Sequence, residues 1–204
     1  MPDLDRLTAA LRAILPVNAA VAATDPTVDY PLLAGETITA VPRRLREYAA
    51  GRAALRQAMA ALGLPAKPIP MNRDRSPALP AGLAASITHG ERACLAAAMT
   101  GARSLGIDLE PDDPLPADLA AEILIPQEQG TPDARLIFSA KEALYKAQYP
   151  VSQTLFGFDA VVVVVAPGTF VGTFLRAVPG FPAGTRLSGR WTRAEGHILT
   201  ALII

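Results

Sequence analysis

The chain has 204 residues, of which 50% are hydrophobic and 19% are charged, and its 19 basic residues balance 19 acidic ones. This length accommodates one domain or two small ones, and so apolar a composition excludes a disordered chain. A net charge of zero also argues against a broadly basic nucleic-acid binder and against a polybasic membrane binder.

Opposite charges nevertheless gather in two separate segments. Between Arg43 and Arg75 there are eight basic residues and two acidic ones, a local balance of +6. Between Asp108 and Asp133 there are eight acidic residues and no Lys or Arg, a balance of −8. Most acids beyond the first two of this second segment are expected to lie in a solvated loop.

The cysteine content and the amino-terminal residues favour a cytoplasmic protein. Cys94 is the only cysteine, which excludes an intramolecular disulfide and fits a reducing compartment. The first residues, Met1–Asp5, are acidic where a secretory signal needs positive charge. The longest apolar runs are far shorter than the roughly 18 residues of a membrane span.

In the first half, apolar spacing predicts two helices, and Gly63 marks the end of the second one. A Pro-rich connection over 65–80 follows, and then two strand-like runs that His89-Gly90-Glu91-Arg92 joins as a turn. The helices are predicted at 7–15 and 42–62, and the strands at 84–88 and 93–99.

In the second half, a short strand and an acidic Pro-rich loop precede a helix that is expected to start at Thr131-Pro132-Asp133 and to stop near Tyr149, before Pro150. The strands are predicted at 105–109, 158–165, 170–177, 187–192 and 197–203. Helix followed by hairpin thus occurs twice. We expect an α+β fold of two similar helix-plus-antiparallel-sheet halves in a pseudo-symmetric arrangement, residues 1–104 and 105–204.

Asp108 and Glu110 are the first candidate functional pair. In a strand, residues two apart point to the same side, so the two carboxylates face one way. Oxygen ligands at this spacing suit Mg²⁺ together with water and substrate phosphates. A solvated strand edge would explain the same spacing without a metal, and the spacing alone favours that explanation.

Glu142 and Lys146 share one face of the second predicted helix, since they are four residues apart. An ordinary surface ion pair is one explanation, and a capping box of Ser139 with Glu142 is another. Only three of the 19 basic residues are Lys, and two of them lie in this helix. A compact ammonium charge of this kind suits a phosphate.

Arg52 falls on the apolar stripe of the helix predicted at 42–62, and Arg44 lies about two turns earlier. A guanidinium there either extends to solvent or meets an anion, because an unpaired buried charge is unfavourable. Gly51 beside it would permit close approach of a ligand or of another backbone.

His89 is expected in the hairpin turn, where a lone histidine is more often simply exposed. A nucleophilic pair of His89 with Cys94 is conceivable, but Cys94 lies among apolar strand residues. A buried structural cysteine is the better interpretation.

Taken together, these stretches resemble the 4'-phosphopantetheinyl transferases, in particular the branch associated with siderophore, polyketide and nonribosomal peptide synthesis. The resemblance runs in order from about residue 40 to the carboxyl terminus. It rests on Arg43–Arg52, Ser86–His89, Gly106–Pro111, Phe138–Ala147 and the closing hairpin from Gly189 to Ala201.

This resemblance implies a cytoplasmic monomer that moves the phosphopantetheine arm of coenzyme A onto a serine of an apo acyl or peptidyl carrier protein. Its two halves would enclose the coenzyme A, and adenosine 3',5'-bisphosphate would be released. It implies that Asp108, Glu110 and Glu142 hold Mg²⁺, and that Glu142 accepts the serine proton.

The same resemblance assigns the remaining contacts. Lys146 would stabilise the transferring phosphate and His89 would contact a phosphate of coenzyme A. Arg44 and Arg52 match positions that grip the nucleotide end. One basic residue of 71–75 is expected to join them, and we choose Arg75.

Two alternatives remain open at this point. One is a non-catalytic module on the same scaffold that binds coenzyme A or a carrier protein. The other is a Mg²⁺-dependent phosphohydrolase that would cleave coenzyme A without a carrier.

Overall fold

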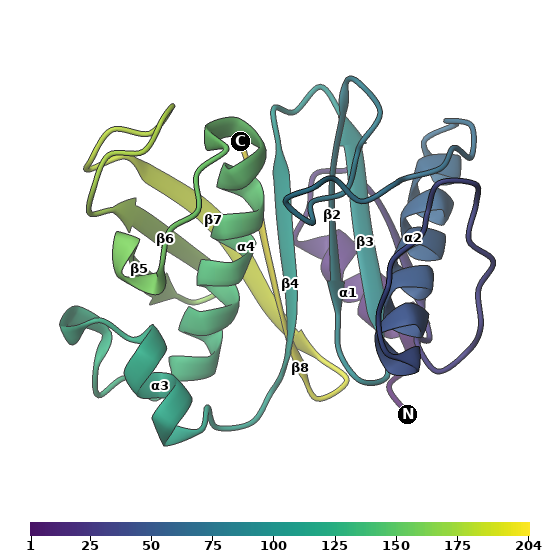
Figure 1. Ribbon diagram of the computed structural model, residues 1–204. Coiled ribbons are helices and arrows are strands. Elements are labelled where there is room, and N and C mark those ends of the chain that lie inside the picture. The colour runs from purple at the N-terminus through teal and green to yellow at the C-terminus, as the bar shows by residue number, and fades with distance from the viewer. The chain divides into compact units, whose positions relative to one another are not determined.

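The structure is a computed structural model that describes residues 1–204 and divides into two compact units, Met1–Ala102 and Arg103–Ile204 (Figure 1). The first unit contains α1 (Leu4–Ala13), β1 (Ala20–Thr24), α2 (Pro42–Ala61), β2 (Leu83–His89) and β3 (Cys94–Thr100). The second contains β4 (Leu105–Pro111), α3 (Ala117–Ile123), η1 (Pro126–Glu128), α4 (Ala134–Ser152), η2 (Phe158–Ala160), β5 (Val161–Ala166), β6 (Thr169–Phe174), β7 (Arg186–Ala194) and β8 (His197–Ile203). The α+β class is confirmed.

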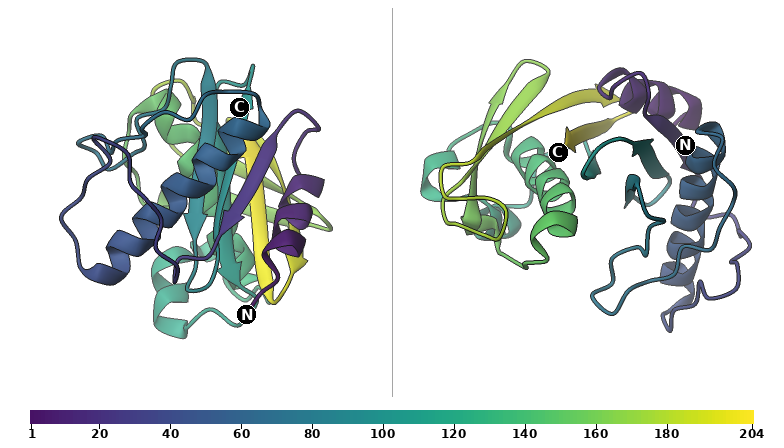
Figure 2. Two further views of the ribbon diagram at one scale, coloured as in Figure 1. Left: turned by 90° about the vertical axis from the view of Figure 1, so that its right-hand side faces the viewer. Right: turned by 90° about the horizontal axis from the view of Figure 1, so that it is seen from above.

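The first unit is a three-stranded antiparallel sheet in the order β1-β3-β2, and α2 packs along it (Figure 2, left). The contact is made largely by alanines, whose small side chains let the helix backbone come close to the strands. Gly51 continues this contact, because a Cβ at that position would lie 3.0 Å from the Ile87 side chain. Gly51 thus serves helix–sheet packing.

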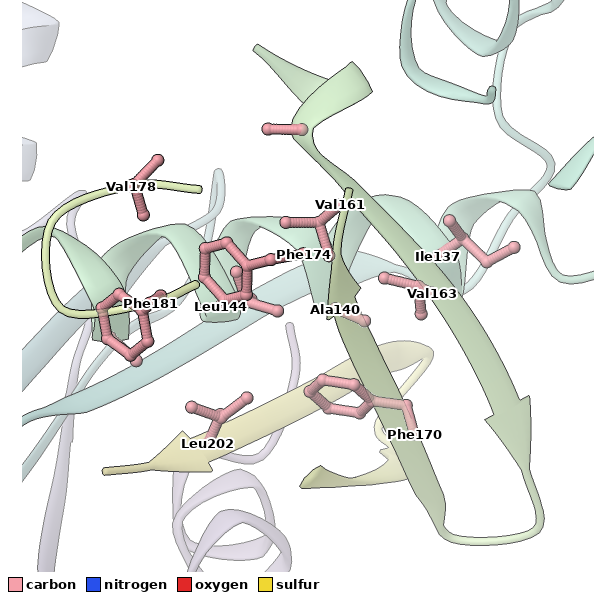
Figure 3. Packing of buried hydrophobic residues seen from close by; sticks show 12 residues of the cluster. Ile137, Ala140, Leu144, Val161, Val163, Phe170, Phe174, Val178, Phe181 and Leu202 are labelled. Atoms are coloured by element: carbon pink, nitrogen blue, oxygen red, sulfur yellow. The ribbon is translucent and has the colours of Figure 1, made fainter. Parts of the chain in front are cut away.

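The second unit is a five-stranded antiparallel sheet in the order β4-β8-β7-β6-β5. Seen from above, its strands curve around α4 (Figure 2, right). Apolar residues of α4 and of the sheet form one core, in which Leu144 lies beside Phe174, and the Phe174 and Phe181 rings stack at 5.0 Å (Figure 3). No helix of the chain is both long and apolar enough to cross a membrane.

Gly106 brings β4 and α4 into backbone contact. A Cβ at Gly106 would lie 1.9 Å from the carbonyl oxygen of Ala143 and 2.7 Å from the nitrogen of Ala147. Ser104, two residues earlier, donates a hydrogen bond to the Ala147 carbonyl. Because no side chain separates the two elements here, the next polar residue of β4, Asp108, comes within reach of side chains on α4.

We expect Gly106→Ala to lower the free energy of unfolding by about 3 kcal/mol, because overpacking against rigid backbone forces the strand away from the helix. Transfer activity should fall as well, since Asp108 moves with the strand. Gly51→Ala is the matched control, because its added methyl group meets side-chain atoms of Ile87 and Cys94 and no backbone atom. Urea unfolding of both variants measures the difference, and equal stability losses would contradict the proposed backbone contact.

The predicted end of the second main helix is wrong. The helix α4 continues through Pro150 to Ser152, and Gln153 closes it in the left-handed conformation with φ of 50°. Proline lacks an N–H and therefore removes one hydrogen bond from the helix, but the pattern resumes after it, since the Gln153 N–H donates to the Tyr149 carbonyl at 2.8 Å. The predicted Thr131 cap is also wrong, since the helix starts after Asp133 and the Thr131 hydroxyl accepts a hydrogen bond from the Asp133 N–H.

Other elements differ from the sequence-based expectation at their ends. The strand β1 and the short helix α3 were not predicted, the first helix starts three residues earlier than expected, and the segment 158–160 is a 3-10 turn before β5. Asp3 explains the earlier start, because its carboxylate accepts hydrogen bonds from the N–H groups of Asp5 and Arg6. His89 ends β2 instead of lying in the turn.

Candidate functional site

One face of α4 carries a row of polar residues. Arg135, Ser139, Glu142 and Lys146 are spaced by four, three and four residues, which places them on one side of a helix. Arg135 and Lys146 contact β4, and Ser139 shares a hydrogen bond of 2.9 Å with Thr200 of β8. The capping box of Ser139 with Glu142 is excluded, because both residues lie inside α4 and neither is at its start.

Lys146 binds the first of the two β4 carboxylates. Its Nζ donates to Asp108 Oδ1 at 2.7 Å and to the Ile107 carbonyl at 3.2 Å. The Asp108 side chain is only 5% exposed, whereas that of Lys146 is 27% exposed. The ammonium group therefore compensates a buried carboxylate and still reaches solvent.

Glu110, the second β4 carboxylate, binds Arg135, whose Nη1 donates to Oε2 at 3.0 Å. Burial raises the pKa of Glu110 to about 7, the charge of Asp108 adds to this, and Arg135 opposes it. A pKa near 7 leaves a protonated fraction at neutral pH, whereas the contact with Arg135 is that of an ionised carboxylate.

Glu142 lies on α4 between these two ion pairs and is half-buried. Burial raises the pKa of Glu142; the charge of Lys146 lowers it and that of Asp108 raises it further. A carboxylate with a raised pKa, close to a cation, is suited to accept a proton near neutral pH.

The three acids fit a divalent cation in their chemistry, although they do not form a closed ligand cluster. The charge of Asp108 raises the pKa of both Glu110 and Glu142, and a cation bound near Asp108 would relieve this repulsion. No group of three acidic, His or Cys side chains lies in an arrangement that holds a metal ion. Asp108 and Glu110 are instead paired with cations of α4.

A pocket of about 170 Å³ opens beside Glu142. The side that belongs to α4 is formed by Lys141, Glu142, Leu144 and Tyr145, and the opposite side by Phe156, Gly157, Phe158 and Val161. The Tyr145 and Phe156 rings meet edge to face at 5.6 Å. The pocket is thus mainly apolar, with one carboxylate at its edge.

The acidic segment is largely ion-paired, although four of its six acids after Glu110 are exposed, as expected: Asp112, Asp113, Asp118 and Glu122. Six of the eight acids between residues 108 and 133 pair with basic residues of α4 or β7. Arg135 also binds Asp113 at 2.6 Å, and Arg193 bridges Asp112 and Asp133. Four basic residues of α4 and β7 thus offset half of the eight negative charges within this unit.

In the first unit, Arg44 and His89 meet at the start of α2. Arg44 Nη1 lies 2.6 Å from His89 Nε2 and 3.2 Å from Glu47 Oε2. Because a guanidinium only donates, His89 Nε2 is the acceptor of this hydrogen bond. Burial raises the pKa of Glu47, but hydrogen bonds from Arg43 and Arg44 outweigh it and the pKa is lowered.

Arg52 does not extend to solvent. It is 6% exposed, its Nε donates to the Ile69 carbonyl at 2.6 Å, and its guanidinium lies 4.2 Å from the centre of the Tyr48 ring. Burial lowers the pKa of Arg52, and Tyr48 partly opposes this shift. No carboxylate forms an ion pair with it, so a buried positive charge is left for an anion to compensate.

Arg75 lies in an exposed turn and adopts φ of 70°, a conformation uncommon for a residue other than glycine. Its N–H donates to the Asn72 carbonyl at 3.0 Å. The turn therefore presents the Arg75 side chain at the surface of the first unit.

Cys94 is fully buried, and its thiol contacts the Thr88 carbonyl. This fits the interpretation of Cys94 as a buried structural cysteine.

Sequence reasoning missed Arg135, Tyr145 and Phe156. Arg135 was detectable, because it lies seven residues before Glu142 on the same helical face. Phe156 follows the end of α4 by four residues and returns to the pocket through a loop, a path that no local pattern reveals.

Two family models match the chain in succession. Residues 35–99 match the 4'-phosphopantetheinyl transferase N-terminal domain, and residues 104–195 match the 4'-phosphopantetheinyl transferase superfamily. Together they cover about three quarters of the chain.

Three curated relatives agree with these matches. The 4'-phosphopantetheinyl transferase Svp of Streptomyces mobaraensis is 38% identical over 194 residues, covering 86% of this chain and 78% of that protein. The 4'-phosphopantetheinyl transferase PptT of Mycobacterium tuberculosis is 33% identical over 183 residues, covering 80% of this chain and 81% of that protein. The 4'-phosphopantetheinyl transferase Npt of Nocardia iowensis is 36% identical over 186 residues, covering 79% of this chain and 83% of that protein. The chain therefore belongs to the 4'-phosphopantetheinyl transferase family.

Proposed function

We propose that this enzyme transfers the 4'-phosphopantetheine arm of coenzyme A to a serine of an apo acyl or peptidyl carrier protein and releases adenosine 3',5'-bisphosphate. The observation that carries this proposal is the arrangement on α4, where Glu142 and Lys146 lie one turn apart beside Asp108 and where Glu142 also lines the pocket. A proton acceptor, a phosphate-binding cation and a site for the pantetheine arm thereby occur near one another.

The reaction forms a bond between the serine oxygen and the β-phosphorus of coenzyme A, which bears the pantetheine arm. The bond from that phosphorus to the bridging oxygen breaks, and the bridging oxygen leaves with the nucleotide. Glu142 accepts the serine proton, because its raised pKa gives it proton affinity while Lys146 keeps part of it ionised. Lys146 binds the phosphate oxygens that carry negative charge during transfer.

Asp108, Glu110 and Glu142 would hold Mg²⁺, whose charge offsets that of the pyrophosphate and of the leaving oxygen. Their carboxylate oxygens are the ligand type that this ion prefers. In the structure Lys146 and Arg135 pair with Asp108 and Glu110 and hold both carboxylates against α4.

The first unit would bind the nucleotide end of coenzyme A. Arg44, His89 and Arg75 are exposed cationic or hydrogen-bonding groups, and Arg52 supplies a buried positive charge without a carboxylate partner. The 3'-phosphate and the diphosphate are the anions that such a set binds. On this proposal residues 1–104 serve binding of the nucleotide and residues 105–204 serve the chemistry.

The pocket beside Glu142 would take the pantetheine arm. The arm is a slender chain that starts at the reacting phosphorus, and the pocket starts at the residue that serves that phosphorus. Its aromatic walls suit the methyl and methylene groups of such a chain. We further propose that the enzyme acts as a cytoplasmic monomer with carrier proteins as its only macromolecular partners.

A panel of apo carrier proteins tests this function. Each is incubated with coenzyme A in Mg²⁺ or in EDTA, and intact mass is recorded. One phosphopantetheine mass is expected on at least one carrier in Mg²⁺ and none in EDTA. Binding of coenzyme A without any mass gain would favour a binding module, and cleavage of coenzyme A without a carrier would favour a phosphohydrolase.

A further inference from the structure

Arg135 uses its whole guanidinium group to hold the end of β4 and the residues that follow it. Its Nη1 donates to Glu110 Oε2 at 3.0 Å, and its Nη2 donates to Asp113 Oδ1 at 2.6 Å. Nη2 also donates to the Pro114 carbonyl at 3.1 Å, and Nε donates to the Asp113 carbonyl at 3.3 Å. All three nitrogens therefore bind the chain between residues 110 and 114, and the Arg135 side chain is only 14% exposed.

A second arginine holds the same stretch of chain from β7. Arg193 Nε donates to Asp112 Oδ1 at 2.9 Å, and its Nη2 donates to Asp133 Oδ1 at 3.5 Å. Asp133 directly precedes α4, and the Asp112 N–H donates to the Gly196 carbonyl in the turn between β7 and β8 at 2.8 Å. The chain between residues 110 and 114 is thus fixed both to the start of α4 and to the β7–β8 hairpin.

Glu110 is held through one of its two carboxylate oxygens. It is the last but one residue of β4, and its side chain has three rotatable bonds, so the strand alone does not fix where the carboxylate lies. Arg135 binds Oε2, whereas no hydrogen bond or ion pair in the structure involves Oε1. One oxygen is therefore fixed while the other is left for a further partner.

The positive charge of Arg135 is largely offset by Asp113. The guanidinium lies closer to the Asp113 carboxylate, at 2.6 Å, than to that of Glu110, at 3.0 Å. The pair of Arg135 with Asp113 is therefore close to neutral, which reduces the repulsion between Arg135 and a divalent cation on Glu110. The main contribution of Arg135 to such a cation site is then the orientation of the carboxylate.

Groups that hold a metal-binding carboxylate by a hydrogen bond tune the affinity for the metal, and their removal typically weakens binding about 10- to 100-fold. We propose that Arg135 is a positioning residue that presents Oε1 of Glu110 to the Mg²⁺ bound with coenzyme A and thereby sets the affinity of the enzyme for this ion. This inference rests on the proposed function and adds to it a residue that acts through Glu110 without touching the reacting atoms.

Arg135→Met tests this role, because it removes the donors and keeps the apolar stem of the side chain. Mn²⁺ is the probe, since it prefers the same oxygen ligands as Mg²⁺ and its free form is counted by electron paramagnetic resonance. Its dissociation constant is measured on the complex of the enzyme with coenzyme A in the absence of a carrier, and coenzyme A alone gives the background. We expect this constant to rise about tenfold or more, while the dissociation constant of coenzyme A in EDTA stays unchanged.

Arg176→Met is the matched control, because Arg176 also pairs with a carboxylate, that of Asp159 at 3.0 Å, but at an exposed position of the same unit. This variant should change neither dissociation constant. Arg135→Lys separates charge from orientation, because its single nitrogen cannot reproduce the rigid fork of the guanidinium. It should bind Mn²⁺ more weakly than the wild type, and it replaces Arg135→Met in the comparison if circular dichroism shows that the methionine variant does not fold.

The outcomes separate the positioning role from the proposed function. A folded Arg135→Met variant with unchanged or stronger Mn²⁺ binding would overturn the positioning role, and so would wild-type affinity in Arg135→Lys, while the transferase function would stand. A wild-type complex that binds no Mn²⁺ beyond the background would contradict the metal site on which the role depends. A wild type that modifies no apo carrier would count against the proposed function itself.

Discussion

Glu142→Gln is expected to lower the rate of carrier modification about 1000-fold, within the range attributed to general acid–base groups. The amide keeps the shape of the side chain but cannot accept the serine proton. Its fold should persist, because the half-buried Glu142 carboxylate has a pKa raised by burial and its removal relieves that unfavourable environment. Mass spectrometry of the carrier measures the rate, and urea unfolding measures stability.

Glu122→Gln is the matched control, since Glu122 is exposed on α3 and forms no ion pair. Glu122→Gln should leave the rate of transfer unchanged.

The wild-type rate of transfer should rise with pH through the raised pKa of Glu142, because this residue must lose its proton before it can accept one. The Glu142→Gln variant should lack this rise. A Glu142→Gln rate within tenfold of wild type would show that another group accepts the proton.

Lys146→Met should lower kcat about 100-fold or more, the scale of losing one charge aimed at a reacting oxyanion. The variant also leaves Asp108 buried without its 2.7 Å partner, so the free energy of unfolding should fall at neutral pH. Single-turnover transfer with saturating coenzyme A measures the chemical step.

Lys67→Met provides the control for Lys146, because Lys67 is exposed and is the one lysine outside α4. Lys67→Met should change neither kcat nor the free energy of unfolding. If Lys146→Met raised KM for coenzyme A with kcat unchanged, Lys146 would bind the substrate without stabilising the transferring phosphate.

Local patterns predicted the elements that depend on local forces. The helix α2 and the strand β8 were predicted from their apolar residues, and the structure buries Tyr48–Leu55 of α2 and Ile198–Leu202 of β8 without a break. The end of α4 was placed about three residues too early, because Pro150 was expected to stop the helix, whereas the helix continues to Ser152. The strand β1 was missed because its five residues, Ala20–Thr24, gain their order from pairing with β3, about 70 residues away.

The residues of the candidate site also divide into those that sequence spacing indicated and those whose partners depend on tertiary contacts. Asp108, Glu110, Glu142 and Lys146 were identified from spacing, and the structure brings them together on β4 and α4. Of the two alternatives expected for Arg52, extension to solvent is wrong: the side chain packs on Tyr48 and donates to the carbonyl of Ile69, seventeen residues away, while binding of an anion stays a prediction. The pairing of the acidic segment with Arg135 and Arg193 likewise depends on tertiary contacts that charge counting along the chain cannot reveal.

The most direct measurement of the central claim is the stoichiometry of one reaction mixture that contains enzyme, coenzyme A, Mg²⁺ and an apo carrier. Holo carrier is counted by intact mass, with the modified serine located by peptide mapping, and adenosine 3',5'-bisphosphate is counted by chromatography. We predict one phosphopantetheinylated serine for each bisphosphate released, and loss of both products with Glu142→Gln. Release of the bisphosphate without modified carrier, or modified carrier formed equally fast without the enzyme, would contradict the assignment.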